Sequence, residues 1–442
     1  MSVTELPVLP EGLVVIVKED CPTCELVIPV LEQLASGNQL TVFSQDDPNF
    51  PEEIADRQFD GDLAISWHHN IETVPTLLVI ENGKEIARTV GWSRSQWESI
   101  TGVPQLGVEL PDHRPGCGSL SVDPSVSADL ELRFGGSAIK ARRVEFASLE
   151  DPHEALFDRG WTDGLPVIPP SEARVMAMLE GTTRSPEEIV ASVPPDLAPC
   201  TVEKVAINAV MAGCRPEYLP IVLAGVEAVC TDTFNMHGLL ATTMPHAPVL
   251  IVNGPIAQQI GMNSGNNALG QGNRANSTIG RAVQLVIRNI GGGRPGEVDR
   301  AAFGSPGKVG FCFAEREEDS PWSPISTMYG FPAGTNTVLA FPGEAPRNLV
   351  DQLSRDPDSL ARTYAANLIS IQHPKLVLGF DAILAVAPDH SRVFREAGWS
   401  REQLADRINE LTVRPGHELI RGAGDIPEGI PEAMGELDLP KF

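Results

Sequence analysis

An apolar run that leads into two closely spaced cysteines is the feature that most constrains this chain. Residues 13–17 read Leu-Val-Val-Ile-Val, and Cys21 and Cys24 follow, separated by Pro-Thr. A short, continuous, β-branched run predicts a buried strand, and the apolar spacing after Cys24 predicts a helix. Cys21 is therefore expected at a helix N-terminus, where unpaired N–H groups and the helix dipole favour thiolate over thiol.

The residues around the two cysteines fit dithiol chemistry. Pro22 suits the first helical position, because that position needs no N–H donor. Cys24 would stand one turn further along the helix, where it can resolve a mixed disulfide formed on Cys21. A zinc site or an inert pair is the alternative. Zinc would need a second close pair of ligands, and the sequence offers no obvious one, so we expect a redox-active pair.

Three more strands are expected in the first hundred residues, at 40–43, 76–80 and 85–90. The second of these strands directly follows Val74-Pro75. A strand, a C-x-x-C motif, a helix and a later Val-Pro before a strand together resemble the thioredoxin superfamily, over roughly residues 10–103. The resemblance implies a thioredoxin-like domain in which Pro75 is cis and faces the cysteine pair.

Charge and length limit the classes of protein to which the chain can belong. It has 442 residues, with 33 basic and 59 acidic side chains and a formal net charge of −26. Nucleic acid is not an expected partner, because phosphate neutralisation needs clustered Lys and Arg, and neither is an anionic membrane surface. The N-terminus lacks a basic region, and no stretch approaches the roughly 20 apolar residues of a membrane span. Seven cysteines over this length are not a disulfide scaffold, so we expect a cytoplasmic protein.

Length and patterning predict an α/β chain of more than one domain. The expected divisions are a thioredoxin-like domain at 1–103, a linker with short strands at 104–149, and a larger mixed α/β domain at 150–442. The short strands of the linker are expected within residues 130–147. Within the larger domain, helices are expected at 171–180, 186–192, 201–213, 216–230, 276–290, 346–353, 357–370 and 400–411. Strands are expected at 248–253, 309–314, 336–341 and 376–387.

Cys117 lies in the Pro/Gly-rich linker, close to His113 and Arg114. Glycines flank it on both sides. It is therefore either an exposed, electropositive thiol that can meet the Cys21–Cys24 pair, or a shielded loop cysteine. The pattern favours neither.

Cys200 precedes the helix predicted at 201–213, so it is a second candidate for a helix N-terminal nucleophile or ligand. Cys214 ends that helix, roughly 20 Å away at ~1.5 Å per residue, and cannot form a disulfide with Cys200. The alternative for Cys200 is a buried core residue. Cys214, Cys230 and Cys312 are expected to pack in the core.

An asparagine-rich segment before the helix at 276–290 is a candidate substrate or cofactor loop. Its candidate binding residues are Asn263, Asn266, Asn273, Arg274 and Asn276. The segment matches G-x-G-x-x-A by letter, but a polar loop separates it from the preceding strand, so a dinucleotide site is not expected. Asn276 is expected to cap the helix, whose N–H groups and Arg274 could hold an anionic or amide-like group. Simple turns are the alternative.

Glu315 follows the strand predicted at 309–314, and catalytic groups often gather at such strand ends. A solvated run of acids is the alternative. His237 and His246 could join Cys200 and a carboxylate in a metal site, but no compact ligand spacing is present. Structural histidines are therefore expected, and no metal or other cofactor is assigned beyond a Cys21–Cys24 disulfide.

The larger domain resembles that of an uncharacterised family of thioredoxin-fused bacterial proteins. The resemblance rests on the run at 199–214 and on the asparagine-rich segment, and it extends over the whole chain. Members of that family continue beyond residue 442 into a Gly-rich segment. The resemblance therefore implies either a longer protein or a separate subunit, and it names no reaction.

The leading hypothesis is a thiol-dependent oxidoreductase. Cys21 and Cys24 would supply reducing equivalents to a small-molecule or thiol substrate, or to Cys117 or Cys200, with tethering raising the effective concentration to about mM. One alternative is a cysteine- or metal-dependent lyase or hydrolase that uses Cys200 and Glu315 and is kept reduced by the thioredoxin-like module. The other is a docking subunit without activity. An oligomer or a complex with a second subunit is expected.

Overall fold

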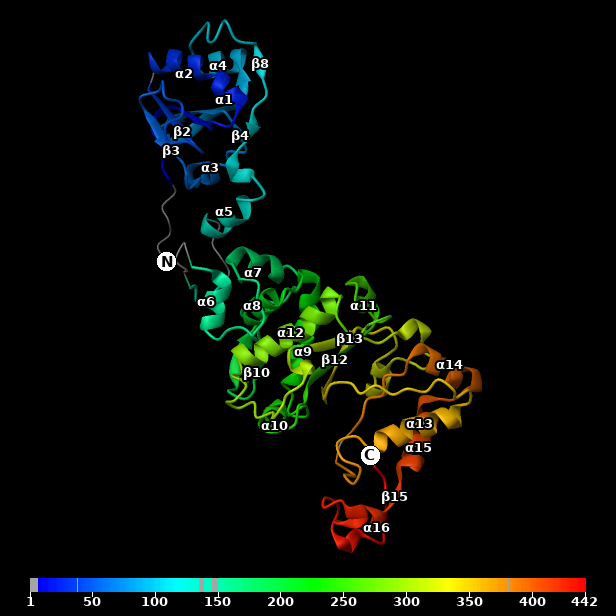
Figure 1. The fold of residues 1–442 in the computed structure, drawn as a ribbon. Helices are drawn as coiled ribbons and strands as arrows, with labels where there is room; N and C mark the ends of the chain where they lie inside the picture. The colour runs from blue at the N-terminus through cyan, green and yellow to red at the C-terminus, as the bar shows by residue number, and fades with distance from the viewer. Residues whose placement is uncertain (1–6, 38, 135–138, 145–149, 380) are drawn as a thin grey trace. The chain divides into compact units, whose positions relative to one another are not determined.

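The computed structural model describes residues 7–442 except residues 38, 135–138, 145–149 and 380. The chain divides into two compact units, Met1–Arg142 and Arg143–Phe442, each of which is described by itself (Figure 1). Helices and strands occur in both, with several small sheets, which confirms the expected mixed α/β class. None of the helices in the described ranges is long and apolar enough to cross a bilayer.

The first unit is built on a five-stranded sheet in the order β3-β2-β1-β5-β6. The strands are β1 (Gly12–Val17), β2 (Leu40–Ser44), β3 (Arg57–Phe59), β5 (Thr76–Glu81) and β6 (Lys84–Val90). β1, β2 and β3 are parallel, whereas β5 runs antiparallel to both β1 and β6. The strand that leads to the cysteines therefore lies at the centre of the sheet, as its unbroken apolar sequence requires.

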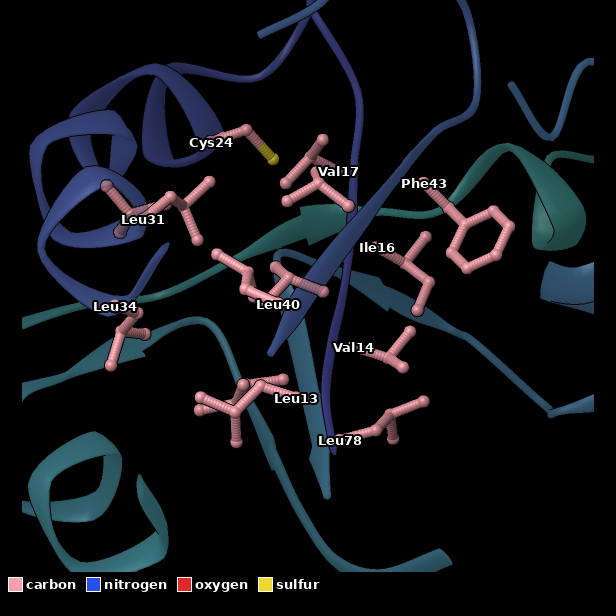
Figure 2. Close-up of a cluster of buried hydrophobic side chains, with 14 of the residues drawn as sticks. Leu13, Val14, Ile16, Val17, Cys24, Leu31, Leu34, Leu40, Phe43 and Leu78 are labelled. Carbon is pink, nitrogen blue, oxygen red and sulfur yellow. The ribbon is translucent and has the colours of Figure 1, made fainter. Parts of the chain in front are cut away.

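The core of this unit lies between the sheet and its helices. Val14 to Val17 are fully buried, and each such side chain contributes about 1.5–3 kcal/mol relative to exposure. Figure 2 shows the Cys24 sulfur in this core beside Val17, with Leu31 on the neighbouring helix. The helices of the unit are α1 (Pro22–Leu26), α2 (Ile28–Ala35), α3 (Ala64–His68), α4 (Arg94–Thr101) and α5 (Ser127–Phe134).

The helix expected after the cysteines is present but is divided into α1 and α2. The break falls at Val27, two residues before Pro29. Proline has no N–H, so Pro29 cannot donate to the carbonyl of Glu25 and the helical ladder is interrupted. Helix α1 is therefore only five residues long and consists mainly of the cysteine motif.

The segment expected to be a linker is partly integrated into the first unit, whose boundary falls after Arg142. Leu106 and Ser119 are buried, and the two-residue strands β8 (His113–Arg114) and β9 (Cys117–Gly118) pair with β7 (Trp92–Ser93) and β4 (Thr73–Val74). The strands expected within 130–147 are not found in its described part. Helix α5 occupies residues up to Phe134 instead, and residues 135–138 and 145–149 lie outside the described ranges.

The second unit contains a three-stranded sheet in the order β13-β12-β14. β12 (Ala247–Asn253) is buried throughout and pairs in parallel with β13 (Phe311–Ala314) and antiparallel with β14 (Thr337–Gly343). Helices α9 (Leu219–Val229) and α12 (Arg274–Asn289) contact this sheet, and α8 (Val202–Ala212) packs against both helices. The smaller helices of this part of the unit are α6 (Pro152–Asp158), α7 (Glu172–Leu179), α10 (Met236–Ala241) and α11 (Pro255–Gln259).

Three elements expected in the second unit are absent or of another type. Residues 186–192 were expected to be helical but contribute to β10 (Ile189–Val193), which pairs with β11 (Ala198–Thr201). The helix expected at 346–353 is not formed, because Asp351 accepts hydrogen bonds from the N–H groups of Leu353 and Ser354 and holds a turn. The described residues of 376–387 form no strand.

The C-terminal part has its own small core around Tyr364 and Phe394. It is formed by α13 (Pro357–Ile369), α14 (Pro388–Ala397) and α15 (Arg401–Thr412). Beyond them, β15 (Arg414–Pro415) pairs with β16 (Asp438–Leu439), and α16 (Gly416–Leu419) lies between them in the chain. The buried ammonium of Lys441 donates to the carbonyls of Ile371, His373 and Leu376, at 3.0, 2.8 and 2.8 Å, and so ties down the end of the chain.

Candidate functional site

Cys21 is the N-cap residue of α1, with an extended backbone. Its sulfur accepts a hydrogen bond from the backbone N–H of Cys24 at 3.3 Å. Pro22 occupies the start of the helix, as expected. A sulfur in the N-cap position faces the unpaired N–H groups of the first turn, so the local fold supplies donors to a thiolate at this point.

Val74, which precedes Pro75, lies in strand β4 and contacts Cys21. The Cys21 sulfur lies 3.7 Å from the carbonyl oxygen of Val74, and the Val74–Pro75 peptide bond is cis. Val74 in turn pairs with Cys117, because β4 and β9 are antiparallel neighbours. Three thiols that are far apart in the sequence, those of Cys21, Cys24 and Cys117, therefore meet at one place in the first unit.

The three thiols have unequal acidities. The pKa of Cys21 is lowered from its ordinary 9.0 to about 5, chiefly by a hydrogen bond with the Cys24 thiol, against an opposing effect of burial. The Cys117 thiol and the backbone N–H groups of Cys24 and Thr23 lower it further. Burial, followed by the hydrogen bond with Cys21, raises the pKa of Cys24 strongly and that of Cys117 as well. At neutral pH the site therefore holds one thiolate, on Cys21, and two thiols that donate to it.

Residues 111–119, here called the cover segment, lie over the cysteine motif. The Thr23 hydroxyl donates to the carbonyl of Pro115 at 2.8 Å, and the Trp92 indole N–H donates to that of Pro111 at 2.6 Å. Cys21 is only 1% exposed, whereas Cys117 is half-buried. Of the thiols in this cluster, Cys117 is thus the one that solvent reaches most readily.

Cys200 does not have the environment expected of a nucleophile. The N-cap of α8 is Thr201, so Cys200 lies one residue before the N-cap, in β11, with its side chain fully buried. Burial raises its pKa to about 12, against a smaller opposing effect of the Lys204 ammonium. Cys214 and Cys312 are buried as expected, and the pKa of Cys230, which is half-buried, is raised to about 11 by burial.

The side chains of the asparagine-rich segment mostly bind the segment itself. The N-cap of α12 is Asn273 rather than Asn276, because the Asn273 side chain accepts from the N–H of Asn276 at 3.0 Å. Asn276 is buried and donates to the carbonyls of Asn263 and Ala268. The further bonds run from Asn263 to the carbonyl of Asn266, from Asn273 to that of Gly261 and from Arg274 to that of Gly213. These hydrogen bonds use the asparagine side chains to hold the turn before α12, as the alternative of simple turns predicts.

Glu315 lies at the end of β13, as expected, but its carboxylate joins structural elements. It accepts hydrogen bonds from the Asn253 side chain at 2.7 Å and from the backbone N–H of Ile325 at 2.8 Å. Arg401 lies 3.9 Å from its other oxygen. The described contacts thus place Glu315 in a junction between the sheet and the C-terminal helices.

His237 and His246 do not form part of a metal cluster in the described ranges, where no group of three or more potential ligands is found. His246 instead lines a cavity of the second unit together with Arg288 and Lys308. Sequence reasoning did not select Arg288 or Lys308. Arg288 is one basic residue among the 33 of the chain, and nothing in its local sequence distinguishes it.

Comparison of the chain with protein-family models, with curated proteins and with solved structures found no match. The geometry of the chain's own residues is therefore the basis for assigning a function.

Proposed function

We propose that the chain is a thiol-dependent oxidoreductase whose first unit is a thioredoxin-like exchange domain. The observation that carries this proposal is the thiolate environment of Cys21, which receives hydrogen bonds from two neighbouring thiols and from the start of a helix. The central place of β1 in the sheet and the Val74–Pro75 bond beside the cysteines also support a thioredoxin-like arrangement. A cysteine pair kept only for packing would not need so acidic a thiol.

The proposed reaction is reduction of a disulfide in two exchange steps. The Cys21 thiolate attacks one sulfur of the substrate, so that the substrate S–S bond breaks, a mixed disulfide forms on Cys21 and the other substrate sulfur leaves as a thiolate. Cys24 then transfers its proton to that leaving thiolate and attacks the Cys21 sulfur. This step forms the Cys21–Cys24 disulfide and releases the second substrate sulfur as a thiolate, which takes a proton from solvent. Two electrons have passed to the substrate, and an external dithiol must reduce the pair again.

The cover segment gives Cys117 a part in this exchange. Because Cys21 is almost fully buried under the segment, a large disulfide meets Cys117 before it meets Cys21. Cys117 lies within hydrogen-bonding reach of Cys21. A substrate disulfide that meets Cys117 forms a mixed disulfide there, and the other substrate sulfur leaves as a thiolate and takes up the Cys117 proton. The Cys21 thiolate then attacks the Cys117 sulfur and releases the second substrate sulfur, and Cys24 attacks Cys21 and releases Cys117. We propose Cys117, rather than Cys200, as the relay thiol, because Cys117 interacts with Cys21 and is half-buried, whereas Cys200 is fully buried.

The proposal is tested by disulfide reduction with the full chain and dithiothreitol as the external donor. Glutathione disulfide serves as the small substrate and insulin as the large one. Cys21→Ser should abolish turnover of both, whereas Cys230→Ser, a matched loss of a half-buried thiol in the second unit, should leave it unchanged. Equal rates for Cys21→Ser and the unaltered chain would refute the proposal.

The relay is tested by trapping. In Cys24→Ser, a disulfide left on Cys21 cannot be resolved by its usual partner, so oxidation with one equivalent of glutathione disulfide followed by peptide mapping should recover Cys21 joined to Cys117. Recovery of Cys21 joined only to glutathione would count against the role of Cys117 while leaving the exchange chemistry of Cys21 intact. Recovery of Cys21 joined to Cys200 would instead identify Cys200 as the relay thiol.

A further inference from the structure

A cavity of about 530 Å³ is lined by residues of the second unit, whereas the three thiols belong to the first unit. It is bounded by α10, the beginning of β12, the last turns of α12 and the loop that follows α12, all of which can be located in Figure 1. Its apolar walls include Met236, Leu240 and Pro248. This volume falls within the roughly 300–1,000 Å³ of small-molecule sites, and such sites combine apolar walls with a few polar groups.

The acidic groups of the cavity are neutralised by partners within the protein. Asp163 receives two hydrogen bonds from the guanidinium of Arg281, at 2.7 and 2.8 Å. Asp299 forms an ion pair with Lys308 at 3.0 Å. Both pairs are largely buried, and each cancels its own charge, so they contribute shape and polarity to the cavity rather than net charge.

Arg288 is the group whose charge is not balanced. It lines the cavity from the last turn of α12. Its Nε atom is buried without a hydrogen-bond partner, and within the described ranges the guanidinium makes no ion pair. A buried charged donor without a partner is costly, and a planar guanidinium matches carboxylate and phosphate oxygens in two-point geometry. Burial lowers the pKa of His246, which also lines the cavity, and so disfavours the charged form of its imidazole.

We propose that this cavity binds a small organic anion, with a carboxylate or phosphate group on Arg288 and a short apolar body against the walls. The ligand class follows from an arginine that makes no ion pair in the described ranges and that lines a cavity with both polar and apolar walls, in a protein whose formal net charge is −26. Long-range attraction cannot recruit an anion to so acidic a chain, so the local guanidinium must supply the selectivity. The inference does not depend on the thiol chemistry of the first unit.

The proposal is tested by isothermal titration calorimetry of the full chain, which compares the affinities of probes that differ only in the head group. The probes share a six-carbon tail and differ in the head group: hexanoate, hexyl phosphate, hexanol and hexylamine. At pH 7 at least one anionic probe should bind about tenfold or more tightly than hexanol, and hexylamine should bind no better than hexanol. The tighter of the two anions distinguishes a carboxylate ligand from a phosphate ligand. Equal affinity for all four probes, or no binding of either anion at about 10 mM, would overturn the proposal.

Two variants locate the binding. Arg288→Gln should weaken anion binding about tenfold or more and remove the preference over hexanol, whereas Arg392→Gln removes the same charge from an exposed pair and should have no effect. Ala301→Trp keeps every charge and fills the cavity that Ala301 lines, so it should abolish binding of both anions. Circular dichroism melts verify that each variant is folded. Unchanged anion binding in folded Arg288→Gln, or in folded Ala301→Trp, would refute the assignment.

Discussion

Replacing Cys24 by alanine tests the electrostatics of the candidate site directly. The difference between an ordinary thiol pKa of 9.0 and the pKa of about 5 at Cys21 corresponds to about 5 kcal/mol in favour of the thiolate. The hydrogen bond with the Cys24 thiol is its largest cause. A hydrogen bond to a charged acceptor contributes about 1.5–3 kcal/mol, so its loss should lower the acid dissociation constant of Cys21 about 10- to 100-fold.

The assay is ultraviolet titration of the reduced protein at 240 nm, where thiolate absorbs. Access to Cys21 does not affect this reading, which matters because the cover segment shields the sulfur. Cys24→Ser is the matched control, since a hydroxyl can still donate to the thiolate and should keep the midpoint low. If Cys24→Ala titrates like the unaltered chain, the Cys117 thiol and the backbone N–H groups are sufficient to hold the thiolate, and the Cys24 thiol is not its main donor.

Three further predictions concern the cover segment, the pH dependence of stability and the end of the chain. In Gly116→Val, the new Cβ atom would lie 2.6 Å from the carbonyl oxygen of Val74, so the cover segment should loosen. Alkylation of Cys21 by iodoacetamide should then be faster. An unchanged alkylation rate would show that the cover segment does not limit access to Cys21. For the reduced protein, the stabilising contribution of the Cys21 thiolate should be complete above its ordinary pKa of 9.0 and lost as the pH falls through about 5. The difference in unfolding free energy between the unaltered chain and Cys21→Ser should therefore grow from pH 5 to pH 9, and a difference independent of pH would contradict the low pKa. Lys441→Met should lower the free energy of unfolding, measured by urea titration, by about 1–3 kcal/mol, because three carbonyls lose a buried donor. An unchanged midpoint of the urea unfolding curve would refute a structural role for the ammonium.

The two proposed sites belong to different units. The thiol cluster lies in the first unit, and the cavity lined by Arg288 lies in the second. If both proposals hold, the chain joins a source of reducing equivalents to a site for a small acid. Measuring disulfide reduction with and without hexanoate would show whether occupation of the cavity changes the rate at Cys21.

Much of the first unit could be predicted from local sequence. The strands at residues 13–17, 40–43, 76–80 and 85–90 are present with small changes at their ends. They could be predicted because a run of β-branched residues indicates a strand whatever its partners are. The helix at 186–192 was wrong for the opposite reason. That segment becomes a strand through pairing with residues 198–201, and such a partner is not visible in a local pattern.

The sequence by itself determined the chemistry that is available to this protein: two cysteines at the start of a helix, a proline before a strand, and a large excess of acidic residues. Periodicity and capping are local, so neighbouring residues are sufficient to specify them. Only the tertiary structure decided which groups meet. The pairing of β4 with β9 places Cys117 at Cys21, burial removes Cys200 from the candidate nucleophiles, and the packing around α12 leaves Arg288 uncompensated in a cavity. These outcomes depend on desolvation and on contacts between distant segments, which no local pattern encodes.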